Sequence, residues 1–156
     1  MNENNFYTVY RRDRVVGKRG GAAFFIKKHS NYIFNRVSLP TKFDSIEAIV
    51  LDFFRVHYRD DLKRIVLIYI PPSAYNSSCY SSLVGDFVIF CSSVSFRCCF
   101  MGDFNLPSVD WANGVFPGSH EYLNVFNSIF DNGPHQIVNS PTGKNNILDL
   151  IIINDQ

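Results

Sequence analysis

A carboxylate and a carboxamide directly follow an apolar segment in "CCFMGDFNLPSVDW", residues 98–111. The segment is typical of a buried strand that breaks near Gly102 and is followed by Asp103 and Asn105. Alternate side chains of a strand point to one side, so these two polar groups could share a side and hold a hard metal ion, orient a water molecule or bind an oxyanion. Gly-Asp and Asn-Leu-Pro are also turn formers, and a simple turn is the alternative at this point.

Two further polar residues stand out in apolar surroundings. Asp149 interrupts the aliphatic run "ILDLIIIN" (147–154). Burying a carboxylate without a partner costs roughly 3 kcal/mol or more, so the run predicts a cation, metal, histidine or set of donors beside Asp149. A structural, hydrogen-bonded Asp at a strand end is the alternative. Tyr69 precedes Ile-Pro-Pro, where prolines end the strand. A phenol there could bond a phosphate oxygen or be an ordinary strand aromatic.

Positive charge gathers at one end of the chain. The net charge of the 156 residues is +1. Residues 1–36, however, hold eight Lys or Arg against Glu3 and Asp13, a basic excess of six. Such a segment can meet a phosphate backbone, and the candidate nucleic-acid-binding residues are Arg11, Arg12 and Arg14. A solvated hairpin face explains the charge equally well.

Short strand-like segments position these residues. They are residues 6–10, 21–28, 46–54, 64–70, 98–103 and 147–154, and the polar "RDDLK" (59–63) predicts the turn of a hairpin. Helical periodicity predicts one helix over 78–94, with an apolar face of Leu83, Phe87, Phe90, Cys91 and Val94. A second helix is predicted over 120–131, with Tyr122, Phe126, Ile129 and Phe130 on its apolar face. The pattern indicates an α+β or layered α/β domain.

The cysteines indicate a reduced environment, and the hydropathy bears on whether the chain spans a membrane. Cys79, Cys91, Cys98 and Cys99 lie in apolar segments without zinc-site spacing. We expect them to be reduced core residues of an intracellular protein, with nucleus or cytoplasm left open. The sequence has no apolar run of about 18 residues, so we predict no membrane span.

Four motifs, in order, give the chain a family resemblance. "YRRDRVVGKRGGAAFFIKK", "LIYIPPS", "FMGDFNLPSVDW" and "PTGKNNILDLIIIND" together resemble the endonuclease/exonuclease/phosphatase superfamily, which has the DNase I and exonuclease III fold. More narrowly, the chain looks like the endonuclease domain of a jockey-like non-LTR retrotransposon. The resemblance covers nearly the whole chain. It implies a two-layer β-sandwich flanked by helices, a four-layer α/β/β/α arrangement that is incomplete here.

The resemblance also implies roles. Tyr69 would lie near the scissile phosphate, and Asp103 would activate or position the attacking water. Asn105 would help bind the phosphate or the water, and Asp149 would orient or pair with a catalytic histidine. The implied cofactor is Mg²⁺. The implied partners are DNA and the reverse transcriptase domain of the same element, which would prime from the nick.

Several family features have no match in the sequence. A strand with an Asn, a metal-binding Glu in a Glu-Thr-Trp-like segment, and a final Ser-Asp-His motif are all missing from residues 1–156, so no metal ligand is assigned here. The turn "GGAAFF" also departs from the family's usual third glycine. We therefore expect a partial domain, truncated at both ends and inactive by itself. The alternatives are a non-catalytic remnant that binds nucleic acid weakly through its basic N-terminal segment, and a phosphatase of the same superfamily.

Overall fold

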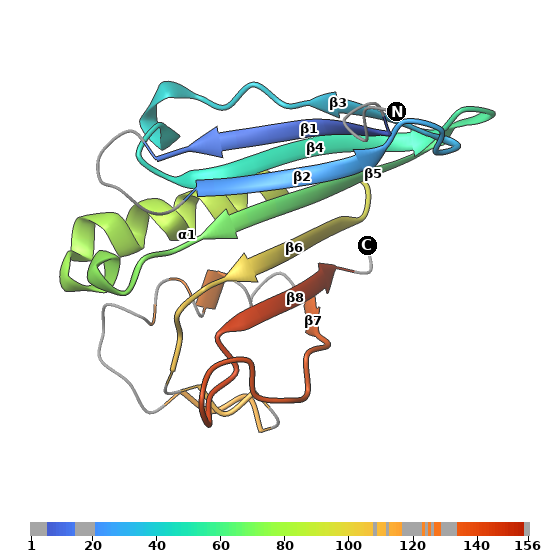
Figure 1. The fold of residues 1–156 in the computed structure, drawn as a ribbon. Helices are drawn as coiled ribbons and strands as arrows, with labels where there is room; N and C mark the ends of the chain where they lie inside the picture. Colours follow the sequence, from blue (N-terminus) through green and yellow to red (C-terminus); the bar gives the residue numbers. More distant parts are fainter. Residues whose placement is uncertain are drawn as a thin grey trace.

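The part of the chain that the structure describes contains two β-sheets and helix α1, in agreement with the α+β prediction (Figure 1). The computed structural model describes residues 6–14, 21–107, 109–111, 113–116, 123, 125, 127–128 and 134–154. β1 (Tyr7–Asp13) and β2 (Gly21–Lys27) pair as an antiparallel hairpin. A six-stranded sheet has the order β3-β4-β5-β6-β8-β7. Its strands are β3 (Tyr32–Arg36), β4 (Glu47–Arg55), β5 (Tyr58–Tyr69), β6 (Cys98–Asp103), β7 (Pro134–Gln136) and β8 (Asp149–Asn154).

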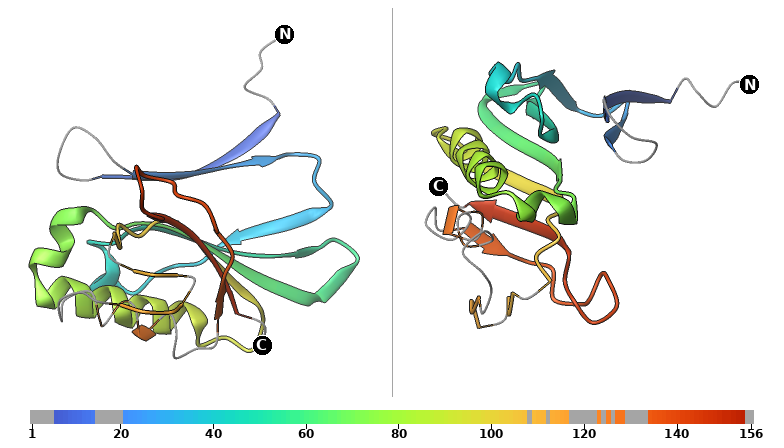
Figure 2. Two further views of the ribbon diagram at one scale, coloured as in Figure 1. Left: turned by 90° about the horizontal axis from the view of Figure 1, so that it is seen from below. Right: turned by 90° about the vertical axis from the view of Figure 1, so that its left-hand side faces the viewer.

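The elements are arranged in three layers. Helix α1 (Ser78–Ser92) covers one face of the six-stranded sheet, and the β1–β2 hairpin lies on the opposite side, packed across β4 and β5 (Figure 2). Short 3-10 helices, η2 (Thr41–Phe43) and η3 (Pro72–Asn76), lead into β4 and α1. The predicted pair of facing sheets is therefore present. Among the described residues, the second sheet has two strands.

Helix α1 follows from a cap and an apolar face. The Ser77 hydroxyl accepts a hydrogen bond from the backbone N–H of Tyr80, which satisfies one of the free donors of the first turn. The helix links β5 to β6, which are parallel and so need a crossover connection. The prediction for 78–94 is confirmed in substance. The fully buried face is shifted, however, to Val84, Phe87, Val88 and Cys91, with Leu83 and Phe90 at its rim.

The predicted turn at residues 59–63 is wrong. The β4–β5 hairpin turns at Val56 and His57, with Arg55 opposite Tyr58, and residues 59–63 belong to β5. Their charged side chains suit the end of a hairpin that extends into solvent, so polarity here marks exposure and not a break in pairing. β3 and β7 were not predicted, because both are short and lack a continuous apolar run.

The cysteine prediction needs one correction. Cys91 and Cys98 are buried and Cys99 is half-buried, and burial raises the pKa of the Cys98 thiol to about 12. Cys79 is exposed, because it lies in the first turn of α1 on the side away from the sheet. Of the predicted helix 120–131, only residues 123, 125, 127 and 128 are described, and these are helical, while its predicted apolar face lies outside the described residues. No helix in the described part of the chain is long and apolar enough to cross a membrane.

Candidate active site

Four polar side chains form a row across one end of the six-stranded sheet. Glu47 of β4 pairs with Tyr69 of β5, Tyr69 pairs with Asp103 of β6, and Asp103 pairs with Asp149 of β8. Directly paired residues of neighbouring strands share a face of the sheet. The next residues along the strands, such as Ile68, pack in the core beneath α1. The row (Glu47, Tyr69, Asp103 and Asp149) therefore lies on the face turned away from α1, toward the β1–β2 hairpin.

A glycine fixes the place of Asp103. Gly102 has a φ of +134°, and a Cβ on it would lie 1.9 Å from the backbone oxygen of Ile68. β6 therefore approaches β5 more closely here than any other residue would allow. The break in the apolar run at "MGD" is thus a requirement of strand packing immediately before the candidate carboxylate.

Asn105 is held beside Asp103 by a turn. β6 ends at Asp103, and Asn105 has a φ of +48°, so the predicted strand alternation of these two residues is wrong. The backbone N–H of Asn105 donates to the Asp103 carboxylate at 3.0 Å. The Asn105 Nδ2 group donates to the backbone oxygen of Ile70 at 2.7 Å. Phe104 is fully buried between them. The turn alternative is correct, and it also brings the two polar groups together.

The surroundings of Asp103 raise its pKa above the usual value of an aspartate. Burial raises the pKa of Asp103, and the negative charge of Asp149 raises it further. The backbone N–H of Asn105 acts in the opposite direction. The balance favours a carboxylate that readily takes up a proton or a cation.

Asp149 is exposed, so the prediction of a buried carboxylate with a partner is wrong. β8 begins at this residue, and the side chain at the end of the strand reaches solvent. Its backbone is nevertheless well held. The Thr142 hydroxyl accepts hydrogen bonds from the N–H groups of both Leu148 and Asp149, each at 2.9 Å. The segment after β6 is joined to the start of β8 as well, because the Phe104 N–H donates to the Leu148 oxygen at 2.9 Å.

Glu47 is a residue of the row that sequence reasoning missed. Its carboxylate accepts from Arg14 Nε at 2.7 Å and from the backbone N–H of Gly21 at 2.9 Å. The Arg14 guanidinium also lies over the Tyr69 ring, 5.4 Å from the ring centroid. The hydrogen bond to Glu47 raises the pKa of Arg14. The available signal was a carboxylate near the start of the apolar run "IEAIVL", the same kind of signal that drew attention to Asp149.

The three predicted arginines do not share one surface. Arg11 pairs with Asp13 at 2.6 Å in an exposed ion pair. Arg12 Nη2 donates to the backbone oxygen of Asp44 at 2.5 Å and lies 3.8 Å from its carboxylate. Side chains alternate along β1, so Arg11 points away from Arg12. With Arg14 bound to Glu47, each of the three has an acidic partner, and their net charge is largely compensated.

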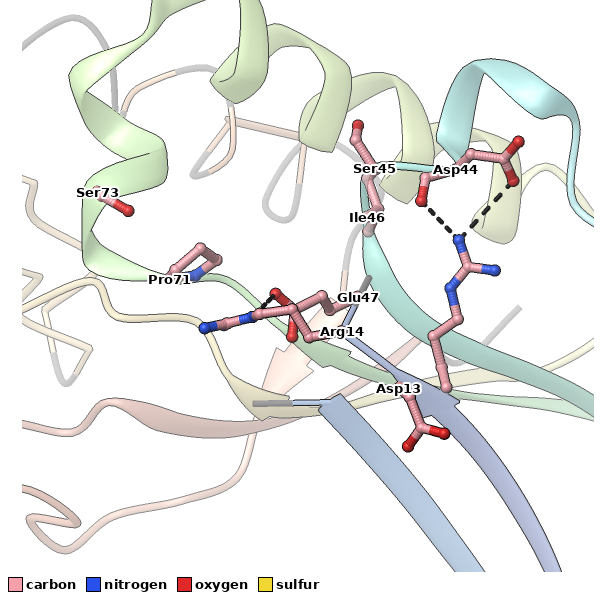
Figure 3. Close-up of a pocket in the computed structure, with 9 residues that line it drawn as sticks. Asp13, Arg14, Asp44, Ser45, Ile46, Glu47, Pro71 and Ser73 are labelled. Carbon is pink, nitrogen blue, oxygen red and sulfur yellow. Dashed lines mark hydrogen bonds and ion pairs between the residues drawn. The ribbon is translucent and has the colours of Figure 1, made fainter. Parts of the chain in front are cut away.

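A cavity of about 340 Å³ opens beside the row (Figure 3). The end of β1, the start of β4 and the segment after β5 form its walls. Arg14 and Glu47 meet on its floor, with Pro71 and Ser73 on one side and Asp44 on the other. The cavity is therefore lined by both guanidinium and carboxylate groups, and Glu47 is the residue of the row that lines it.

The fold of the chain has counterparts among solved structures. No family model and no curated protein matches the sequence. The endonuclease domain of TRAS1, a telomere-specific non-LTR retrotransposon, superposes with a TM-score of 0.62 at 14% identity, over 97% of this chain and 66% of that one. An endonuclease/exonuclease/phosphatase family protein from Bacteroides thetaiotaomicron superposes with a TM-score of 0.51 at 13% identity, over 96% of this chain and 60% of that one.

The chain shares its fold with these two proteins. This confirms the fold that the sequence motifs predicted. The chain spans 66% and 60% of the length of the two solved proteins, so it corresponds to part of each.

Within this endonuclease/exonuclease/phosphatase fold, the described residues fit the implied Mg²⁺ only in part. Asp103 and Asp149 offer carboxylate oxygens, which are hard ligands of the right kind. In the described ranges, however, no three His, Cys, Asp or Glu side chains lie close enough together to hold a metal ion. We therefore assign no reaction step to a metal.

Proposed function

We propose that this chain forms the central part of a DNA endonuclease active site of the non-LTR retrotransposon kind. The observation that carries the proposal is the row of Tyr69, Asp103 and Asp149, with Asn105 turned in beside it, on a fold shared with a retrotransposon endonuclease. The reaction is hydrolysis of a phosphodiester bond. In such an element, the nick would give the reverse transcriptase domain its primer, and the protein would act inside the cell.

Each side chain has a role that its surroundings support. Asp103 has a raised pKa, which suits a group that positions a water molecule and accepts its proton. Tyr69 can donate its hydroxyl hydrogen to a phosphate oxygen. Asn105 keeps Asp103 in place through its backbone N–H. Asp149 adds negative charge beside Asp103, which strengthens the affinity of Asp103 for a proton.

Nicking of supercoiled plasmid tests the proposal. The proteins are the 156-residue chain and a chimera that adds the parts of the TRAS1 endonuclease domain lying outside the matched 66%. We expect the chain alone to give no Mg²⁺-dependent nicking, because each missing transition-state contact can cost about 100-fold in rate. We expect the chimera to nick, and Asp103→Ala in the chimera to abolish the nicking. Asp86→Asn, on the exposed side of α1, is the matched control and should leave nicking unchanged.

Two results would contradict this. A chimera that folds but does not nick would show that the row no longer supports the reaction. Nicking by the chain alone, lost in Asp103→Ala, would show that the row suffices without further groups. The same preparations assayed on a small phosphomonoester separate an endonuclease from a phosphatase of the same fold.

A non-catalytic nucleic-acid-binding role is the second candidate. The basic excess of residues 1–36 favours it. The acidic partners of Arg11, Arg12 and Arg14 weaken it, since compensated charges release few counterions on binding. Salt-dependent DNA binding that survives Asp103→Ala but is lost when these arginines are changed to Glu would support this role.

A further inference from the structure

Glu47 lies where the β1–β2 hairpin meets the active-site row. It is the first residue of β4 and stands opposite Tyr69 in the sheet. Its two carboxylate oxygens bind the two sides of the hairpin: Arg14, just after β1, and Gly21, the first residue of β2. One side chain therefore joins both strands of the hairpin, where β1 ends and β2 begins, to the edge of the site.

The pair formed by Glu47 and Arg14 differs from an ordinary surface ion pair. The side chains of Glu47 and Arg14 are 14% and 26% exposed, whereas those of Arg11 and Asp13, on the same strand, are 69% and 66% exposed. Exposed pairs contribute little, but a shielded pair fixes geometry, because separation would leave each charge without its partner in a place where little water can replace it. Glu47 also accepts a second, backbone donor, so its ionised form is matched by two hydrogen bonds.

Arg14 connects Glu47 to Tyr69. Its Nε is committed to Glu47, and its guanidinium lies over the Tyr69 ring. The Arg14 Nη2 atom is buried and has no hydrogen-bond partner within the described structure. A guanidinium held in this way, next to a phenol, is directed by Glu47 and keeps one buried donor that no acceptor satisfies.

We infer that Glu47 is a positioning residue, which acts through Arg14 to set the orientation of Tyr69 and to join the hairpin to the active-site row. The inference deepens the proposed function and rests on it for the meaning of Tyr69 as a phosphate contact. Since Glu47 compensates the charge of Arg14, the pair supplies direction to the donors and adds little long-range attraction for DNA.

The test follows Tyr69 and Gly21 separately in the full chain. NMR of protein with ¹³C-labelled tyrosine rings gives the Tyr69 signal, assigned by its loss in Tyr69→Phe. Amide hydrogen exchange reports the Gly21 N–H. The variants are Glu47→Gln, Glu47→Ala and Arg14→Lys, and Asp86→Asn in the exposed Lys42–Asp86 pair is the control.

In Glu47→Gln and Glu47→Ala, we expect the Tyr69 signal to move and Gly21 exchange to accelerate at least ~10-fold, since a charge-assisted hydrogen bond is lost. In Arg14→Lys, we expect Tyr69 to move while Gly21 stays protected, because Lys keeps the charge but loses the planar group over the ring. Asp86→Asn should change neither. If Glu47→Ala does not fold, Glu47→Gln and Arg14→Lys decide the matter.

An unchanged Tyr69 signal in folded Glu47→Gln and Arg14→Lys would overturn the inference. So would a Gly21 amide that exchanges equally fast in the wild type and in Glu47→Gln. These measurements use no DNA, so a failure of the nuclease proposal in the plasmid assay would leave their outcome untouched, and the two ideas can fail independently.

Discussion

The two ends of the six-stranded sheet treat their aspartates differently. At the end near the β4–β5 turn, Asp52 receives two hydrogen bonds from Arg64, at 2.7 and 2.9 Å. Arg64 is itself buried, donates to the Cys91 oxygen and lies over the Phe96 ring. At the other end, Asp103 faces a second carboxylate, Asp149, across the β6–β8 pair.

The difference separates a carboxylate that has a cationic partner from one that lies beside another carboxylate. An ion pair with bidentate geometry gives the first end a fixed, satisfied carboxylate. Two neighbouring carboxylates at the second end raise the affinity of Asp103 for a proton or cation, at some cost in stability. Such uncompensated charge is typical of reaction sites, where the missing partner is the substrate, a proton or an ion.

The largest expected effect is a loss of stability at the end of the sheet that holds Asp103. Gly102→Ala should destabilise the protein by about 4 kcal/mol or more, because its Cβ would meet backbone that cannot move without separating strands. The clash would be with the Ile68 oxygen, 1.9 Å away. Urea unfolding followed by circular dichroism measures this. Gly114→Ala is a control, since Gly114 also has a positive φ, of 63°, but lies outside the strands of the sheet. Equal losses in both variants would mean that backbone conformation, and not the close approach to β5, explains the effect.

The next largest effect is a loss of stability at the end of the sheet that holds Asp52. Arg64→Ala should cost about 3 kcal/mol, because it leaves the Asp52 carboxylate without its partner in a partly buried place. Replacing both residues, as Asp52→Asn with Arg64→Met, should recover a large part of this loss, since no unpaired charge then remains. Urea unfolding of the two variants checks it. A double variant no more stable than Arg64→Ala would show that the unpaired charge of Asp52 is not the cause of the loss.

Sequence reasoning selected candidate residues at places where a polar residue interrupts or ends an apolar strand. Asp103, Asn105, Asp149 and Tyr69 were all found in this way, and strand register brings three of them into one row. Register depends on pairings between distant segments, so periodicity within one segment could not show that Asp103 and Asp149 are direct neighbours.

Glu47 and the correct environment of Asp149 were beyond that reasoning for a physical reason. The residues around Asp149 are aliphatic, but only the strand's end point decides whether its side chain reaches solvent. The environment of Glu47 is made by Arg14 and Gly21, which are 33 and 26 residues away in sequence. Local patterns predict strands and core residues well because burial follows periodicity, whereas contacts between a hairpin and a distant strand leave no periodic trace.

The smallest expected effect is a change in how the stability of the protein depends on pH. Because the pKa of Asp103 is raised in the folded state, its contribution to stability is complete at pH values below the ordinary Asp range and is lost as pH rises through the raised pKa. Asp103→Asn removes this titration. At neutral pH it should therefore be more stable than the wild type by about 0.5 kcal/mol, a modest value because solvent screens a partly exposed carboxylate. The advantage should vanish as the pH falls into the Asp range.

Asp61 provides the control of opposite sign. Its hydrogen bond with Lys63 lowers the pKa of Asp61, so the stability it contributes is present at neutral pH and lost as the pH falls through its lowered pKa. Asp61→Asn should therefore be less stable than the wild type at neutral pH, and the gap should close in acid. Urea unfolding from acid to neutral pH compares the two variants. A loss of stability at neutral pH in Asp103→Asn would mean that the hydrogen bond from Asn105 outweighs the repulsion by Asp149, and that this end of the sheet is as satisfied as the Arg64 end.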